Sequence, residues 1–402
     1  MRLSTQGFFT ASLAAMQSQA AELAKLLNQV GLGRRVNSPA DDPIASVHIR
    51  ELERAQSESE QIAKNSVLIR NRLNLEEQAL ADAGTILTRV RELTGKAANI
   101  GTLSDADRRS IATELDSRLS ELLDLANRQD GAGEYLFAGF STLTKPFTGG
   151  GDAPIVYAGD QGSRLIQIGP AQRLADSHSG FDVFVDIPEG NGVFATSANA
   201  ANTGSGVIHP GSVVDRPSWV PDDYTVVFTA ADAWEVRDSA TPQNVVASGA
   251  YVSGAPIEFN GVRIEISGQP AVNDEFTVSR SRSKDIFTTV RDLAQALRDT
   301  AETPAGAARL ATALEGAMQQ VDQASEHLIS VRSQVGARLS ALDTADSARE
   351  SRDVDIASAL SELRDVDYAE ALMKMNQRLV GLQAAQLSYS QISQLSLFSY
   401  LR

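Results

Sequence analysis

The sequence predicts a mainly α-helical protein with an inserted all-β domain, in an elongated architecture of nested domains. Three observations favour this fold. Apolar residues recur at helical spacing at both ends of the chain, two further long seams lie inside them, and most of the glycine and both tryptophans gather in residues 139–283. Because the chain leaves the helical part and returns to it, the N- and C-terminal helices are expected to pair as a coiled coil, with a long-helix bundle in the middle and the β domain at the tip.

These observations divide the chain into three expected domains, two of them discontinuous. The terminal coiled-coil domain comprises residues 1–36 and 356–402. The long-helix bundle domain comprises residues 37–138 and 284–355, and the β-rich outer domain comprises residues 139–283. An elongated molecule follows, because a helix advances about 1.5 Å per residue.

The first and last helices carry heptad seams, which are typical of helices that pack against other helices along their length. The first seam consists of Phe9, Leu13, Met16, Ala20, Leu23, Leu27 and Val30. The last consists of Leu372, Met375, Leu379, Leu382, Gln386 and Tyr389. Apart from Ala20 and Gln386, these are the residues that we expect at the interface between subunits.

The energetics of the first seam indicate that it needs partners from outside the chain. Its side chains contribute on the order of 10–20 kcal/mol when they are buried. Ordering about thirty residues costs ~1–2 kcal/mol per residue in backbone entropy. We therefore expect both ends to be largely disordered in the free subunit and to fold when neighbouring copies supply the missing faces.

Residues 31–43 are expected to interrupt the helices, because two glycines within three positions end the first one. The pairs Ser38-Pro39 and Asp42-Pro43 each resemble a helix start, with an N-cap side chain before a proline. The segment is either a loop with caps or a fixed elbow between two domains. In the second case, one of the arginines at 34 and 35 pairs with one of the aspartates at 41 and 42. The elbow residues are then Arg34, Asn37, Pro39, Asp41, Asp42 and Pro43.

Long helices are expected on both sides of the β insert. The first runs from Ile44 to about Asn99 and ends at Gly101, and a shorter one opens at a capping box of Ser104 and Asp107. The seam of the first is Ile62, Ser66, Ile69, Leu73, Glu76, Leu80, Ala83, Leu87 and Val90. The later seam is Leu314, Ala317, Val321, Ala324, Leu328, Val331, Val335, Arg338 and Leu342. Residues 345–355 are either a solvated helix or a joint before the last helix, which runs to 402.

Within the insert, short β-rich runs are expected to form strands. They are residues 155–157, 165–168, 183–187, 224–229 and 257–266. The last run contains Asn260-Gly261 between alternating apolar residues, which is a strong hairpin signal. Residues 190–217 are polar and glycine-rich and are expected to form a long loop.

Composition excludes several classes of function. A formal net charge of −15 argues against binding to nucleic acid or an anionic membrane, because an acidic chain repels these polyanions. No apolar run approaches the ~18 residues of a membrane span, and we expect no cleaved secretion signal. The absence of cysteine removes disulfides and thiolate chemistry. His48 and Glu51 lack the second histidine of a zinc motif, so we expect no catalytic residue, no metal, no cofactor and no enzymatic activity.

Several motifs resemble the flagellin superfamily, and within it the hook-associated protein 3 family of hook–filament junction proteins. Asn37-Ser-Pro-Ala-Asp-Asp-Pro43 is similar to the family's Asn-x-Pro-x-Asp-Asp-Pro elbow. Residues 101–108 resemble its helix-opening segment, and residues 130–139 with 146–147 resemble its exit into the β domain. Residues 202–204, 259–262 and 365–369 also fit the family.

The resemblance implies a structural component of the bacterial flagellum that joins the hook and hook-associated protein 1 to the flagellin filament. It implies a homo-oligomeric ring assembled through the terminal helices. It also implies secretion through the flagellar type III apparatus to the extracellular flagellum, with an export chaperone that first holds the C-terminal helix.

Two alternatives remain at this point. The chain could be a filament flagellin, which polymerises alone into long tubes. It could also be an enzyme carried in the β insert of a flagellin scaffold, although the missing metal-binding pair argues against this.

Overall fold

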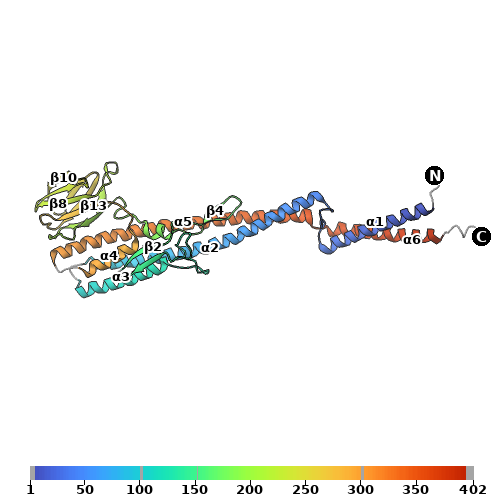
Figure 1. The fold of residues 1–402 in the computed structure, drawn as a ribbon, viewed down its shortest axis with the longest axis horizontal. Helices are drawn as coiled ribbons and strands as arrows, with labels where there is room; N and C mark the ends of the chain where they lie inside the picture. The colour runs from blue at the N-terminus through green and yellow to red at the C-terminus, as the bar shows by residue number, and fades with distance from the viewer. Residues whose placement is uncertain (1–4, 100–102, 152, 300–302, 395–402) are drawn as a thin grey trace, which may run out of the picture. The chain divides into compact units, whose positions relative to one another are not determined.

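The computed structural model describes residues 5–99, 103–151, 153–299 and 303–394 (Figure 1). The predicted helix end at Gly101, the first residues of the 101–108 motif and the predicted end of the last helix lie outside the described residues. The chain forms two compact units. One contains the residues up to Lys64 and from Thr344, and the other contains Asn65–Asp343.

The helices of the described residues lie where the apolar periodicity predicts them. They are α1 (Thr5–Leu32), α2 (Pro43–Ala97), α3 (Asp105–Ala126), α4 (Ile286–Arg298), α5 (Pro304–Arg364) and α6 (Tyr368–Gln394). The helix end predicted at Gly31-Leu-Gly33 is confirmed, although α1 continues through Gly31 to Leu32. It ends before Gly33, whose φ of +71° is in the left-handed region that glycine adopts at little cost.

The long seams of α2 and α5 are buried as expected. All nine predicted seam residues of α2 are buried, including Ser66 and Glu76. In the α5 seam, Ala317 and Arg338 are only half-buried and the remaining seam residues are buried. Because α5 is continuous through residues 345–355, these residues form a helix and not a joint.

The capping box predicted at the start of α3 is present. Ser104 Oγ accepts the backbone N–H of Asp107 at 3.2 Å, and the Asp107 carboxylate accepts the backbone N–H of Ser104 at 3.1 Å. Reciprocal bonds of this kind satisfy two of the amide groups that the first turn leaves without helical partners.

The strands form antiparallel pairs in four sheets among the described residues. They are β1 (Phe147–Gly150), β2 (Ala153–Tyr157), β3 (Leu165–Gln167), β4 (Arg173–Ala175), β5 (Phe194–Ala198), β6 (Val207–Ile208), β7 (Ser212–Val213), β8 (Tyr224–Ala230), β9 (Ala233–Arg237), β10 (Val245–Ala250), β11 (Pro256–Phe259), β12 (Val262–Ser267) and β13 (Glu275–Arg280). The largest sheet has the order β10-β9-β8-β13-β5, and a second has the order β11-β12-β6 with β7 also on β12. The pairs β1-β2 and β3-β4 are separate hairpins.

The hairpin predicted at Asn260-Gly261 joins β11 to β12, in register from Phe259↔Val262 to Pro256↔Glu265. Both turn residues have positive φ, 42° and 78°, as the tight hairpin turn requires. Two other predictions are wrong. Residues 181–185 form a π-helix instead of a strand, and the expected long loop at 190–217 contains β5, β6 and β7.

Two aromatic and aliphatic cores hold this part of the chain together. One fills the space between the two larger sheets and includes Phe194, Tyr224, Phe228, Ile264 and Phe276. The other packs the β1 hairpin and the π-helix onto α4: the rings of Phe147 and Phe287 lie 5.0 Å apart, and Phe184 lies 5.8 Å from both. The β1–β2 hairpin therefore belongs with the helices, outside the core of the larger sheets.

Candidate subunit interface, elbow and buried polar network

The helices α1 and α6 lie side by side and run in opposite directions (Figure 1). At one end the rings of Phe9 and Tyr389 meet edge to face, 5.5 Å apart. Further along, Arg378 pairs with Glu22 at 2.8 Å and donates to Gln19 Oε1 at 3.4 Å. The two predicted helices of the terminal domain therefore do contact each other.

The contact between α1 and α6 uses a different heptad register from the predicted seams. The half-buried positions on α1 are Phe9, Ser12, Met16, Gln19, Leu23, Leu26, Gln29 and Val30. The covered positions on α6 are Ala371, Met375, Arg378, Leu382, Ala385 and Tyr389. Seven of the eleven predicted interface residues thus face the helix partner within the same chain: Phe9, Met16, Leu23, Val30, Met375, Leu382 and Tyr389.

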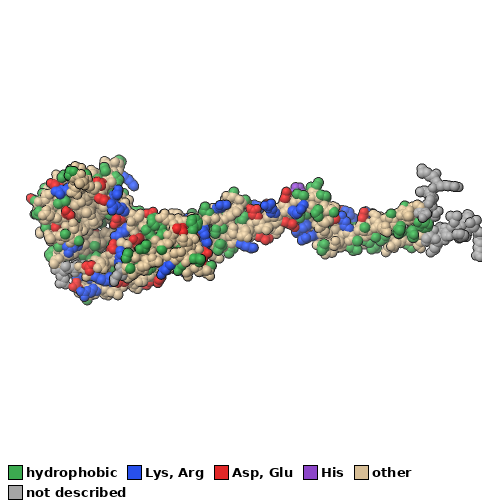
Figure 2. All heavy atoms as spheres, in the orientation of Figure 1, with side chains coloured by type: hydrophobic (Ala, Val, Ile, Leu, Met, Phe, Trp, Pro, Cys, Tyr) green, Lys and Arg blue, Asp and Glu red, His purple; other side chains and the backbone are tan. Residues whose placement is uncertain are grey.

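The other four predicted interface residues remain exposed, and we call them the outer flank. Leu13 is 48% exposed, Leu27 53%, Leu372 42% and Leu379 40%. Each follows directly after a residue that faces the other helix. Because the helices are antiparallel, equivalent positions lie on the same side of the pair, so the outer flank forms one apolar strip. Figure 2 shows hydrophobic side chains on the surface of the α1–α6 pair.

The segment between α1 and α2 is fastened by two aspartates. Asp41 pairs with Lys25 at 2.8 Å and accepts the backbone N–H groups of Asn37 and Ser38. The hydrogen bond from Lys25, with those backbone donors, lowers the pKa of Asp41 to about 2. Asp42 Oδ1 accepts the N–H of Ala45 at 3.0 Å and so caps α2.

The same segment is joined to the chain between α5 and α6. Arg34 and Asp365 form an isolated antiparallel bridge. The N–H of Arg35 donates to Arg364 O at 2.7 Å, and the N–H of Val366 donates to Gly33 O at 3.1 Å. Both crossings between helices therefore share one small piece of sheet, which favours a fixed elbow over a simple loop.

The predicted elbow pairings are present in part. Arg35 and Asp42 form an ion pair at 3.5 Å, whereas Asp41 pairs with a lysine of α1. Of the two predicted helix starts, Pro43 opens α2, but Pro39 lies in a turn. Below the elbow, Val36 packs in a small core with Ala45, Ile49, Ile356 and Leu360.

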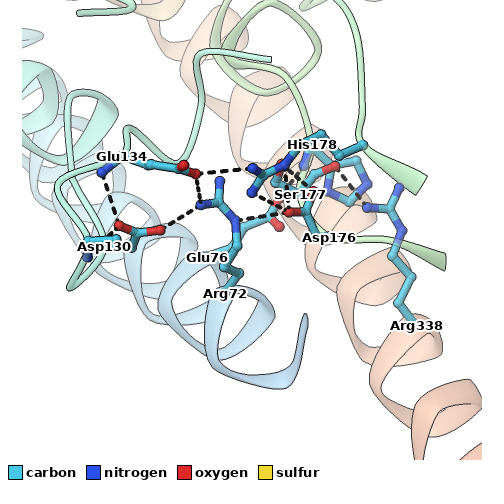
Figure 3. A network of polar contacts seen from close by, with 10 residues as sticks. Arg72, Glu76, Asp130, Glu134, Asp176, Ser177, His178 and Arg338 are labelled. Atoms are coloured by element: carbon cyan, nitrogen blue, oxygen red, sulfur yellow. Dashed lines mark hydrogen bonds and ion pairs between the residues drawn. The ribbon is translucent and has the colours of Figure 1, made fainter. Parts of the chain in front are cut away.

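A buried polar network in the other unit was missed by the sequence analysis (Figure 3). Arg72 of α2 is only 2% exposed and pairs with Asp130 at 2.6 Å and Glu134 at 3.2 Å. Its Nε lies 3.2 Å from the fully buried Asp176, which Arg164 also contacts at 2.7 Å. These ion pairs join α2 to two loops that are distant in sequence.

The network continues to α5 through His178. Its Nδ1 lies 2.6 Å from Glu76 Oε1, which also accepts the backbone N–H of His178 at 3.1 Å. Its Nε2 lies 3.3 Å from Gln334 Oε1, and Arg338 Nη1 donates to Ser177 O at 3.2 Å. Burial lowers the pKa of Arg338. The sequence did contain one signal of this network, because Glu76 and Arg338 are polar residues that interrupt the two apolar seams.

The network is an arrangement of ion pairs and hydrogen bonds that holds segments together. Among the described residues, no group of three or more histidine or carboxylate side chains is placed to bind a metal ion. Over the same residues, no helix has both the length and the apolar character needed to cross a membrane.

Comparisons with known proteins point to one group of relatives. The bacterial flagellin N-terminal helical region matches residues 3–142, and the bacterial flagellin C-terminal helical region matches residues 318–401. The flagellar hook-associated protein 3 of Salmonella typhimurium is 36% identical over 190 residues, which are 46% of this chain and 58% of the relative. The Escherichia coli protein of the same name is 32% identical over 233 residues, 58% of this chain and 72% of the relative.

Solved structures agree with these matches. The crystal structure of Xanthomonas campestris FlgL has a TM-score of 0.72 and 38% identity, and the match covers 77% of this chain and 99% of that one. The flagellar junction protein FlgL from Legionella pneumophila has a TM-score of 0.70 and 32% identity, covering 79% of this chain and all of that one. The mostly helical fold with a sheet-rich part is thus the fold of these relatives.

Proposed function

Because the chain belongs to the flagellar hook-associated protein 3 family, we propose that it is a structural subunit of the junction between the flagellar hook and the flagellin filament. The similar Legionella pneumophila protein is described as a flagellar junction protein, which supports this role. The subunit assembles with further copies of itself into a ring, with hook-associated protein 1 on one side and flagellin on the other. It has no enzymatic activity and no cofactor.

The domain organisation that supports this role is the nested one expected from the sequence. Residues 1–36 and 356–402 form the terminal coiled-coil domain, and residues 37–138 and 284–355 form the helix bundle. The outer β-rich domain, expected at residues 139–283, has its core in the larger sheets from β5 to β13, whereas the β1–β2 hairpin packs on the helices. The antiparallel contact of α1 with α6 and the double crossing at the elbow support the first boundary. The separate core of the larger sheets supports a distinct outer domain.

The proposed assembly mechanism rests on one observation. After α1 and α6 have packed together, four leucines of the outer flank are still 40–53% exposed. An apolar strip along a helix pair is typical of a helical assembly in which further helices cover it. The outer flank is therefore the contact with the terminal helices of neighbouring subunits, while the other seven predicted residues hold the pair itself together.

The same strip explains the need for an export partner. A chain with exposed leucines on its terminal helices would self-associate before secretion, so a chaperone covers the flank of α6 in the cytoplasm. Secretion through the flagellar type III apparatus then delivers the subunit to the growing end of the flagellum.

The test is the incorporation of a Leu27→Asp variant into flagella. Leu27 is 53% exposed on the α1–α6 pair, so its replacement is expected to leave the middle of the chain folded. The variant is expected to be excluded from the assembly, because the neighbouring helices would bury an unpaired carboxylate. Asn28→Asp is the matched control, since it places the same charge on the adjacent exposed residue of α1. Flagella that contain both variants in equal amounts would refute the assembly mechanism.

A filament flagellin is the less supported alternative, because the relatives with the higher identity are hook-associated proteins. Copy number separates the two: a flagellin would form long tubes by itself, whereas a junction subunit is confined to a ring.

A further inference from the structure

Polar side chains occupy inward positions of the α1–α6 pair, while neighbouring leucines stay outside. The ring contact of Phe9 with Tyr389 and the hydrogen bond from Arg378 to Gln19 show which positions of the two helices lie opposite each other. Three layers are apolar, namely Phe9–Tyr389, Met16–Leu382 and Leu23–Met375, and the three that alternate with them are Ser12–Ala385, Gln19–Arg378 and Leu26–Ala371. The alternating layers thus contain one leucine, whereas the four leucines of the outer flank remain exposed.

A second arrangement of the same two helices would bury those four leucines. A rotation of each helix by about 50°, half of the ~100° that separates successive residues, keeps the three apolar layers and exchanges the other three. The exchanged layers would be Leu13–Gln386, Ala20–Leu379 and Leu27–Leu372. This is the arrangement that apolar periodicity predicts, because it buries more apolar surface within the chain. Some other interaction must therefore favour the observed arrangement.

Arg378 supplies such an interaction. Its guanidinium pairs with Glu22 at 2.8 Å and donates to Gln19 Oε1 at 3.4 Å. Around the axis of α1, Glu22 lies about 140–180° away from Leu27 and Leu13. The rotation that brings these leucines inward therefore carries Glu22 away from α6 and separates it from Arg378.

The ion pair contributes specificity more than stability. The side chains of Arg378 and Glu22 are 43% and 51% exposed, and exposed ion pairs add little to stability. A polar residue in the seam of a helix pair nevertheless selects one arrangement over its competitors at a cost in apolar burial. The selection matters most in the assembly, where neighbouring helices cover the outer flank and its leucines are buried in either arrangement.

We propose that Arg378, through Glu22 and Gln19, sets the rotation of α1 and α6 about their own axes and so keeps the outer flank turned toward neighbouring subunits. The elbow holds the two helices at one end, and the chain advances about 20 Å from Asp365 to Arg378, so the Arg378 contact is a second point of control. The leucines contact the neighbours, and Arg378 is a positioning residue that acts through the helix pair. The inference rests on the proposed function, in which neighbouring helices cover the flank.

The absence of cysteine allows a direct test by disulfide formation. The variant Ser12→Cys with Ala385→Cys places two thiols opposite each other in the observed arrangement. The matched control is Leu13→Cys with Gln386→Cys, whose thiols lie opposite each other only after the rotation. In oxidised flagella from cells that carry one variant as the only copy, the first is expected to form a disulfide within each chain, and the control is not. A control that forms this disulfide as efficiently would overturn the inference.

Charge reversal in the first cysteine variant then tests the role of Arg378. Arg378→Glu places like charge beside Glu22, so the disulfide yield within the chain and the amount of chain in flagella are both expected to fall several-fold. Addition of Glu22→Arg restores the pair with its charges exchanged and is expected to restore both quantities. Lys374→Glu makes the same change of charge on an exposed residue that pairs within α6, and it is expected to leave both unchanged.

The outcomes separate this inference from the proposed function. Normal disulfide yield and normal incorporation of the Arg378→Glu variant would show that the positioning role is wrong, and the proposed function would stand. A loss that Glu22→Arg does not restore, or that Lys374→Glu reproduces, would also overturn the role of the pair. If even the unmodified chain is absent from flagella, the proposed function fails, and this inference with it.

Discussion

Replacement of Asp176 by asparagine is expected to destabilise the unit Asn65–Asp343 strongly. Asp176 is fully buried and pairs with Arg72, which is 2% exposed, and with Arg164. Removal of one partner from a buried ion pair costs roughly 3–5 kcal/mol, because it leaves a buried charge without compensation. Arg72 keeps its pairs with Asp130 and Glu134, so the lower end, about 3 kcal/mol, applies. For a unit of this size, that corresponds to a decrease in Tm of about 5 °C.

The assay measures thermal unfolding of the purified chain by differential scanning calorimetry. Asp343→Asn is the matched control, because the Arg70–Asp343 pair has a similar distance, 2.6 Å, but its aspartate is 64% exposed. Exposed pairs contribute about 0–1 kcal/mol, so the control is expected to shift Tm by about 2 °C at most. Equal shifts for the two variants would refute the view that the buried network holds α2 to the loops.

Two further predictions concern the terminal unit. The pKa of Asp41 is lowered to about 2 from an ordinary 3.8, so the stability that it contributes is fully present above about pH 4 and is lost as the pH falls through 2. Asp41→Asn should therefore lower the urea midpoint at pH 7 and make a much smaller difference at about pH 2, where Asp41 is half protonated in the folded chain; an undiminished difference in acid would contradict this. Backbone NMR of the free subunit at low concentration should show α1 and α6 as flexible segments, because the pair leaves its outer flank uncovered. Rigid and protected terminal amides would show that the ends are complete without neighbours.

The sequence predicts the elements that apolar periodicity controls. The seam of α2 is correct residue by residue because a buried stripe recurs every three to four positions, whatever lies opposite it. The same argument could not choose between registers at the termini. Leu26 and Leu27 are both apolar, and the contact with α6 also uses polar residues such as Ser12, Gln19 and Arg378. Only the packing of two whole helices decides which leucine faces inward.

The buried network could be predicted only in part. Glu76 and Arg338 were visible as interruptions of two apolar seams, but their partners come from loops more than fifty residues away. The wrong strand at 183–187 has a similar origin. Val183 and Phe184 read as part of a β-rich run, yet Phe184 is buried in an aromatic cluster with Phe147 and Phe287, and that packing is compatible with a π-helix. Tertiary contacts overrode the local preference.

The central claim is that the two ends of the chain, and not its middle, join it to the flagellum. The most direct test replaces the full chain in the cell by residues 40–345 and examines the flagella by electron microscopy. The account predicts a folded, monomeric fragment in sedimentation experiments, together with hooks that carry no filament and flagellin released into the medium. Filaments attached to hooks in cells that contain only the fragment would contradict it.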